Sequence, residues 1–81
     1  MNISVIYFSV LKKITGKSQE VIRLEKQMSA EDLFGLLSKK YPEMVRYKPY
    51  IRLSVNQEYL PFETRLKPDD EVVFITPVSG G

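Results

Sequence analysis

The segment SAEDLFGLLSKKY, residues 29–41, carries the strongest helical pattern in the sequence. Ser29 is a favourable N-cap, and Glu31 and Asp32 fall in the first turn, where exposed backbone N–H groups favour negative charge. Asp32 also occupies the capping-box position. The apolar residues recur at intervals of three and four and form one stripe: Ala30, Leu33, Phe34, Leu37 and Tyr41. Because Pro42 cannot continue the helix, the sequence predicts one amphipathic helix that covers one face of a sheet.

Two strands are predicted before this helix. Residues 2–8, NISVIYF, alternate along a strand, with Ile3, Val5 and Tyr7 on one face and Ser4, Ile6 and Phe8 on the other. Residues 9–16, SVLKKITG, end at Gly16 and fit a single helical turn or a loop. Residues 19–25, QEVIRLE, alternate again, so the two strands are expected to form a hairpin with a long connection.

A second hairpin is predicted after the helix. The strand YIRLSV, residues 50–55, places Ile51, Leu53 and Val55 on one side, and EYLP, residues 58–61, follows a turn at Asn56 and Gln57. The turn type stays open, because a type I′ turn needs positive φ at both central positions and glutamine is poorly suited to it.

The last strand is predicted in EVVFITP, residues 71–77, after the polar turn LKPDD. Val72 and Phe74 face opposite to Val73 and Ile75, and Pro77 removes a ladder donor and ends the pairing. The order of strand, strand, helix, strand, short strand, strand favours the α+β class, with a mixed β-grasp sheet packed on one main helix. By analogy with that fold, the first and last strands lie in parallel at the centre. Residues 1–76 then form one domain, from which residues 77–81 extend as a tail.

Residues 43–50, between the main helix and the second hairpin, are predicted to be irregular. The segment RYKPYIR, residues 46–52, interleaves basic and aromatic residues, which could indicate stacking on single-stranded nucleic acid. The simpler interpretation is preferred: Tyr47 and Tyr50 shield the core edge while Arg46, Lys48 and Arg52 stay solvated.

Composition narrows the function classes. The 81 residues include no cysteine and no histidine, so the chain has no thiolate nucleophile and lacks the commonest acid/base group, and it is not expected to catalyse a reaction alone. The net charge of +2 makes no strong case for a nucleic acid or a membrane as partner.

The sequence has no span of roughly 20 apolar residues and no signal-peptide pattern, so a cytoplasmic location is expected. Asp69, Asp70 and Glu71 are interpreted as turn chemistry, and no metal is expected.

The tail PVSGG, residues 77–81, is not explained by packing. A frayed end is the simplest interpretation, since termini tolerate change. A carboxylate, however, reacts only after activation, for instance as an acyl-adenylate, and an enzyme must admit the terminus through a narrow channel. Glycine passes where other residues clash. Residues 77–81 are therefore predicted to form an arm whose reactive carboxylate is on Gly81, with Gly80 permitting threading.

The segments DDEVVFITPVSGG, VNQEYL and IYFSVLKKITG, together with the length, resemble the MoaD family, the small sulfur-carrier subunits of molybdopterin synthase. The resemblance covers nearly the whole chain and implies a ubiquitin-like fold. It implies that Gly81 is adenylated by a ubiquitin-activating-like adenylyltransferase and converted to a thiocarboxylate. The resemblance further implies that this sulfur is transferred to a pyranopterin precursor of the molybdenum cofactor by the large subunit of molybdopterin synthase, within a heterotetramer. The resemblance also implies that no cofactor is bound and that the acyl-adenylate and thiocarboxylate are covalent intermediates.

The resemblance also assigns roles residue by residue. The arm matches at Pro77, Val78, Ser79, Gly80 and Gly81. Partner contacts are implied at Phe8, Lys12, Tyr59 and Ile75. Lys12 stands where the family commonly has arginine, Ile75 and Thr76 stand where phenylalanine and proline are frequent, and Tyr59 replaces an aliphatic residue.

Strand parity independently predicts an interface. If Ile3 and Val5 face the helix, Ile6 and Phe8 face solvent, and exposed apolar patches usually mark binding surfaces. The alternative is that Phe8 and Ile75 pack under residues 43–50 as a satellite of the core.

Other functions remain open from the sequence. The chain could carry sulfur for thiamine thiazole synthesis or transfer-RNA thiolation, or act as a protein modifier that joins Gly81 to lysines. It could also be a β-grasp binding module with an incidental tail.

Overall fold

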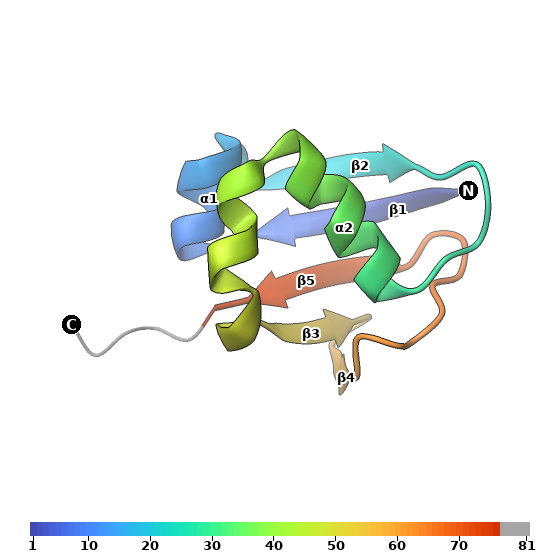
Figure 1. Ribbon diagram of the computed structural model, residues 1–81. Helices are drawn as coiled ribbons and strands as arrows, with labels where there is room; N and C mark the ends of the chain where they lie inside the picture. Colours follow the sequence, from blue (N-terminus) through green and yellow to red (C-terminus); the bar gives the residue numbers. More distant parts are fainter. Residues whose placement is uncertain (77–81) are drawn as a thin grey trace.

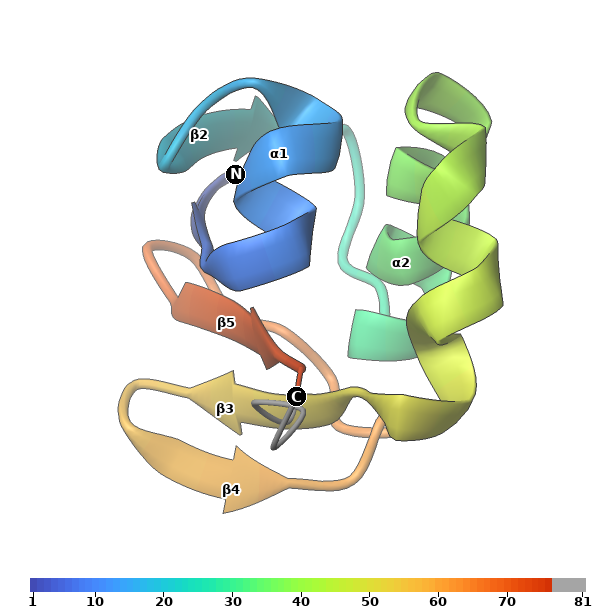
Figure 2. The same cartoon turned by 90° about the vertical axis from the view of Figure 1, so that its left-hand side faces the viewer.

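Five strands form one mixed sheet, and the helices lie over one of its faces (Figures 1 and 2). The computed structural model describes residues 1–76. The elements in chain order are β1 (Asn2–Tyr7), α1 (Ser9–Thr15), β2 (Gln19–Arg23), α2 (Ala30–Lys40), the 3-10 helix η1 (Pro42–Tyr50), β3 (Arg52–Val55), β4 (Glu58–Leu60) and β5 (Glu71–Ile75). The strand order is β2-β1-β5-β3-β4, with β1 and β5 parallel at the centre and the other neighbours antiparallel. The predicted β-grasp architecture is confirmed.

The main helix starts as its sequence predicts. The Ser29 hydroxyl accepts a hydrogen bond from the Asp32 amide at 3.1 Å, and the Asp32 carboxylate accepts one from the Ser29 amide at 3.3 Å. This reciprocal capping box fixes the first turn of α2. The stripe predicted on the helix is buried at Ala30, Leu33, Phe34 and Leu37, and Tyr41 is partly buried.

The inner face of the sheet supplies the other half of the core. On each strand, residues that the sequence places on one side are buried against the helices: Ile3, Val5, Tyr7, Leu53, Val55, Val72 and Phe74. The Phe74 ring lies edge-on to Phe34, with centroids 5.3 Å apart, and stacks on Phe62 at 6.1 Å. The predicted parity of β1, β3 and β5 is therefore confirmed.

Two connections are more regular than the sequence predicts. Residues 9–15 form the seven-residue helix α1, which ends at Gly16. Gly16 has a φ of 76°, a left-handed conformation that glycine adopts easily because it has no Cβ. Such a short helix is not stable alone, and burial of Leu11 in the core holds it. Residues 42–50 form η1 instead of an irregular loop because Met44 is fully buried.

The predicted role of the tyrosines in η1 is half right. Tyr47 packs against the core, whereas Tyr50 is 64% exposed and is not among the side chains that pack against the core. Lys48 is also not simply solvated, because its ammonium pairs with Glu31 at 2.6 Å and lies over the Phe62 ring at 5.5 Å.

The structure decides the turn between β3 and β4. Asn56 and Gln57 have φ of 52° and 70°, the signs of a type I′ turn. Tertiary contacts hold this conformation: the Asn56 side chain donates to Asp70 at 2.8 Å and accepts from the Glu71 amide at 2.9 Å. Asp70 also accepts from the Lys67 amide at 2.7 Å, in keeping with its interpretation as turn chemistry.

Glu20 on β2 fastens the C-terminal end of α2 to the sheet. Its carboxylate accepts hydrogen bonds from Tyr7 at 2.8 Å, Lys40 at 2.8 Å, Lys17 at 3.3 Å and Tyr41 at 3.3 Å. Burial alone would raise the pKa of Glu20, but the hydrogen bonds from Lys40, Tyr7 and Lys17 outweigh it and lower that pKa from 4.5 to about 2. Burial and the adjacent carboxylate raise the pKa of Tyr7, so its phenol stays protonated and donates.

We expect Glu20 to make the stability depend on acid pH. Its pKa is lower in the folded state, so its contribution is fully present above about pH 4.5 and is lost as the pH falls towards 2. The loss should be on the order of 2 kcal/mol in the free energy of unfolding, measured by urea titration at each pH. Glu20→Gln should be less stable at pH 7 and should lose less on acidification, whereas the exposed control Glu25→Gln should behave as wild type. Equal acid sensitivity of wild type and Glu20→Gln would contradict this role.

None of the helices within residues 1–76 is long and apolar enough to cross a membrane.

Candidate functional site

The site is organised around the end of β5, the strand that leads to the predicted arm. β5 ends at Ile75 between β1 and β3, in the middle of the sheet (Figure 1). The roles predicted for the arm fall on residues outside the described part of the chain: Pro77, Val78, Ser79, Gly80 and Gly81. Within the described residues, the candidate site is the surface that surrounds Ile75.

Two rows of side chains cross the sheet on the side away from α2. Ile6 is level with Val73, Val73 with Ser54 and Ser54 with Tyr59. Two positions further along these strands, a second row contains Phe8, Ile75 and Arg52; Arg52 and Ile75 are direct partners. Phe8 follows β1 with extended backbone angles, φ −125° and ψ 160°, so it keeps the parity of Ile6. These seven residues are called the outer face below.

Besides Pro77, Val78 and Ser79 of the arm, four partner-binding residues were predicted from the sequence, and the outer face brings together three of these four. Phe8 is 55% exposed, Tyr59 is 66% exposed and Ile75 is half-buried. Neither Phe8 nor Ile75 belongs to the core or to the side chains packed against it. The alternative that they form a satellite of the core under residues 43–50 is therefore wrong, because η1 lies with the helices on the opposite side of the sheet (Figure 2).

Lys12, the fourth predicted residue, is not part of this surface. It lies on α1, and its side chain is exposed. Lys12 is only four residues after Phe8 in the sequence, but it lies on a helix and belongs to neither row of the sheet.

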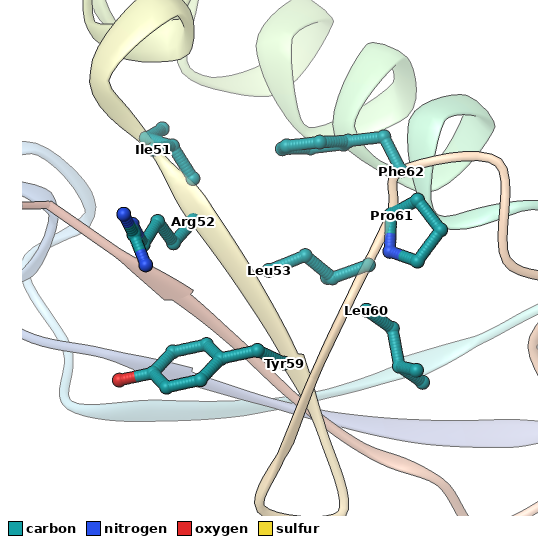
Figure 3. Close-up of a pocket in the computed structure, with 7 residues that line it drawn as sticks. All are labelled: Ile51, Arg52, Leu53, Tyr59, Leu60, Pro61 and Phe62. Atoms are coloured by element: carbon teal, nitrogen blue, oxygen red, sulfur yellow. The ribbon is translucent and has the colours of Figure 1, made fainter.

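Arg52 belongs to the outer face, although its sequence context predicted only a solvated side chain. Its guanidinium carbon lies 6.0 Å from the centre of the Tyr59 ring. Figure 3 shows both side chains extending to the same side of β3. They border a shallow pocket of about 310 Å³, which is lined by Ile51, Arg52, Leu53, Tyr59, Leu60, Pro61 and Phe62. Strand alternation could have predicted that Arg52 faces outward, since it precedes the inward-facing Leu53. Its pairing with Ile75 could not be predicted, because it depends on the register between β3 and β5.

The chemistry of the outer face is that of binding. It combines exposed aromatic and aliphatic groups with one cation, and it carries no carboxylate, imidazole or thiol among its seven residues. Within residues 1–76 no three acidic, histidine or cysteine side chains gather as a group that could hold a metal ion. The groups with shifted pKa values, Tyr7, Glu20 and Lys40, belong to the cluster that fastens α2.

Comparison with known proteins agrees with this arrangement. Residues 5–81 match the ThiS family. The chain is 30% identical over 82 residues to the human molybdopterin synthase sulfur carrier subunit, covering 98% of this chain and 93% of the human protein. The structure of SAMP1 from Haloferax volcanii superposes with a TM-score of 0.86 at 19% identity, covering all of both chains. A chain from a protein–protein complex of subunits 1 and 2 of molybdopterin-converting factor from Helicobacter pylori has a TM-score of 0.71 at 20% identity, also over both full chains. At these identities the two structures support the fold, while the match over residues 5–81 and the full-length human relative show that the chain belongs to the ThiS family of ubiquitin-like sulfur carriers.

Proposed function

We propose that this chain is the sulfur-carrier subunit of molybdopterin synthase in molybdenum cofactor biosynthesis. The observation that carries the proposal is the likeness, over nearly the full length of both chains, to the human sulfur carrier subunit. The outer face adds physical support, because a carrier must be held by its partner close to the strand from which its arm extends.

The reaction is proposed to take place on Gly81. A ubiquitin-activating-like adenylyltransferase transfers AMP from ATP to the carboxylate and releases pyrophosphate. A sulfur donor at the oxidation level of sulfide then attacks the acyl carbon, so that the bond to AMP breaks, a carbon–sulfur bond forms and AMP leaves. The sulfur of the resulting thiocarboxylate attacks a carbon of the pyranopterin precursor and displaces an oxygen substituent from it. Water then cleaves the bond between the Gly81 acyl carbon and sulfur, which leaves the sulfur on the precursor and restores the carboxylate. No resident cofactor is needed, since both intermediates are covalent states of this chain.

The large subunit of molybdopterin synthase is the proposed acceptor complex. The Helicobacter pylori structure contains the two subunits of molybdopterin-converting factor together, and one of its chains shares this fold. In the proposed assembly, a heterotetramer of two small and two large subunits, Phe8, Tyr59 and Ile75 contact the large subunit. Pro77, Val78 and Ser79 lead Gly80 and Gly81 towards its catalytic groups.

The test is to locate sulfur on the chain. The protein is purified after co-expression with its adenylyltransferase and a sulfur source, and its mass is measured intact and after fragmentation of the C-terminal peptide. Replacement of oxygen by sulfur nearly matches methionine oxidation in mass, and the chain has three methionines, so the shift must be localised to Gly81 or captured by thiol-selective alkylation.

Sulfur on Gly81 that a purified large subunit can use on the pterin precursor is the expected result. An unmodified terminus with active adenylyltransferase would contradict the carrier function. Conjugates between Gly81 and lysines of other proteins, in place of a thiocarboxylate, would indicate a protein modifier. Sulfur on Gly81 that only a thiamine or transfer-RNA pathway accepts would retain the carrier and replace the partner.

A further inference from the structure

The outer face contains one feature that an apolar docking surface does not require. Six of its seven residues are apolar, aromatic or the small buried Ser54, and the seventh is Arg52. Arg52 lies directly beside Ile75, the last residue of the strand that leads to the arm. A charge at this place is close to the point where any partner must receive the arm.

The Arg52 guanidinium has no acidic partner among residues 1–76. The three ion pairs in this part of the chain involve Lys17, Lys40 and Lys48, and no side-chain hydrogen bond there uses Arg52. Its neighbour is the exposed Tyr59 ring, with which it makes a cation–π contact. At a separation of 6.0 Å the ring is a close neighbour of the guanidinium, whose N–H donors make no side-chain hydrogen bond within residues 1–76.

This arrangement prepares Arg52 for a planar anion. A guanidinium held against a ring has less side-chain freedom to lose on binding than a free one, and its donors match a carboxylate in a bidentate geometry. The surrounding Ile75, Tyr59 and Phe8 would exclude water from such a contact, which strengthens it. The fit is to a protein surface with an apolar patch and a carboxylate at its edge.

We propose that Arg52, positioned by Tyr59, is a specificity-determining residue of the outer face and binds an aspartate or glutamate side chain of the large subunit beside the entry point of the arm. The inference deepens the proposed function and rests on it for the identity of the partner. Arg52 is proposed to act only in binding the large subunit and takes no part in the reaction on Gly81.

The experiment measures binding of the purified full-length chain to the purified large subunit by calorimetry, at low and at raised salt. Arg52→Gln should weaken the affinity at least about tenfold, and Arg52→Glu should weaken it further because two carboxylates would then face each other. Wild-type binding should weaken with salt more steeply than binding of Arg52→Gln. The matched controls are Arg46→Gln and Arg46→Glu, which make the same charge changes at an exposed position on η1 and should leave the affinity within about twofold of wild type.

A double-mutant cycle tests the positioning by Tyr59. Tyr59→Phe retains the ring and should bind nearly as wild type, whereas Tyr59→Ala should lose affinity, and most of that loss should disappear in the Arg52→Gln background. Thermal unfolding of each variant should match wild type, because both side chains are exposed.

The outcomes separate this inference from the proposed function. If wild type binds the large subunit and the Arg52 variants bind as tightly as the Arg46 controls, the role of Arg52 is refuted and the carrier function stands. If wild type does not bind the large subunit, the proposed partner is wrong and the inference falls with it, whatever sulfur is found on Gly81.

Discussion

Deletion of Gly80 and Gly81 is expected to reduce sulfur transfer below detection while leaving the fold intact. The deletion removes the carboxylate that is proposed to be adenylated and leaves one on Ser79, whose side chain and shorter arm do not suit a narrow channel. The core that the structure describes is supplied by elements up to β5, which ends at Ile75. The free energy of unfolding should therefore change by less than about 0.5 kcal/mol.

The measurement is thiocarboxylate formation with the adenylyltransferase, followed by transfer in the presence of the large subunit. Gly81→Leu tests the same site without shortening the arm, and it should fail at adenylation although its affinity for the large subunit stays within a few fold of wild type. Normal sulfur transfer by either variant would refute the assignment of Gly81. Loss of activity together with a lowered unfolding temperature would instead point to a structural role for the tail.

Two phenylalanine-to-alanine substitutions are expected to have opposite effects on folding and docking. Phe74→Ala should lower the free energy of unfolding by about 3–5 kcal/mol, because Phe74 is fully buried between α2 and the sheet and leaves a cavity beside Phe34 and Phe62. That is a large part of the roughly 5–15 kcal/mol typical of a whole domain. Phe8→Ala makes the same chemical change at a residue that is 55% exposed, so it should cost less than about 1 kcal/mol.

Urea unfolding and binding to the large subunit distinguish the two substitutions. Phe8→Ala should keep the wild-type unfolding midpoint and lose roughly tenfold or more in affinity, as removal of an aromatic interface residue commonly does. Phe74→Ala should shift the midpoint strongly. A destabilised Phe8→Ala variant would show that Phe8 is part of the core after all, and unchanged binding by a folded Phe8→Ala variant would remove it from the docking surface.

The elements that could be predicted are those whose signals lie close together in the chain. The capping box of Ser29 and Asp32 and the apolar stripe of α2 are contained in one segment, and the alternation in β1, β3 and β5 repeats every two residues. Phe8, Tyr59 and Ile75 were found partly through parity and partly through resemblance to a family, and all three lie on the outer face.

The elements that were missed depend on contacts between distant residues. The single turn expected at residues 9–16 became the helix α1 because Leu11 enters the core, and the irregular stretch became η1 because Met44 does. The positive φ of Gln57 has no local cause in its sequence, but the neighbouring Asn56 is held by Asp70 and Glu71 from the segment before β5. In each case tertiary packing outweighs a weak local preference.

The order of the strands and the main helix along the chain, the alternation of side chains within each strand and the family likeness could all be predicted from the residues alone. How the ends of the strands line up depends on the folded chain, which places Phe8, Ile75 and Arg52 in one row, Arg52 near Tyr59, and Tyr7, Lys40 and Tyr41 around Glu20. The physical reason is that burial is encoded by residue type at a local period, whereas register between strands is fixed by the summed packing and hydrogen bonding of segments far apart in the chain.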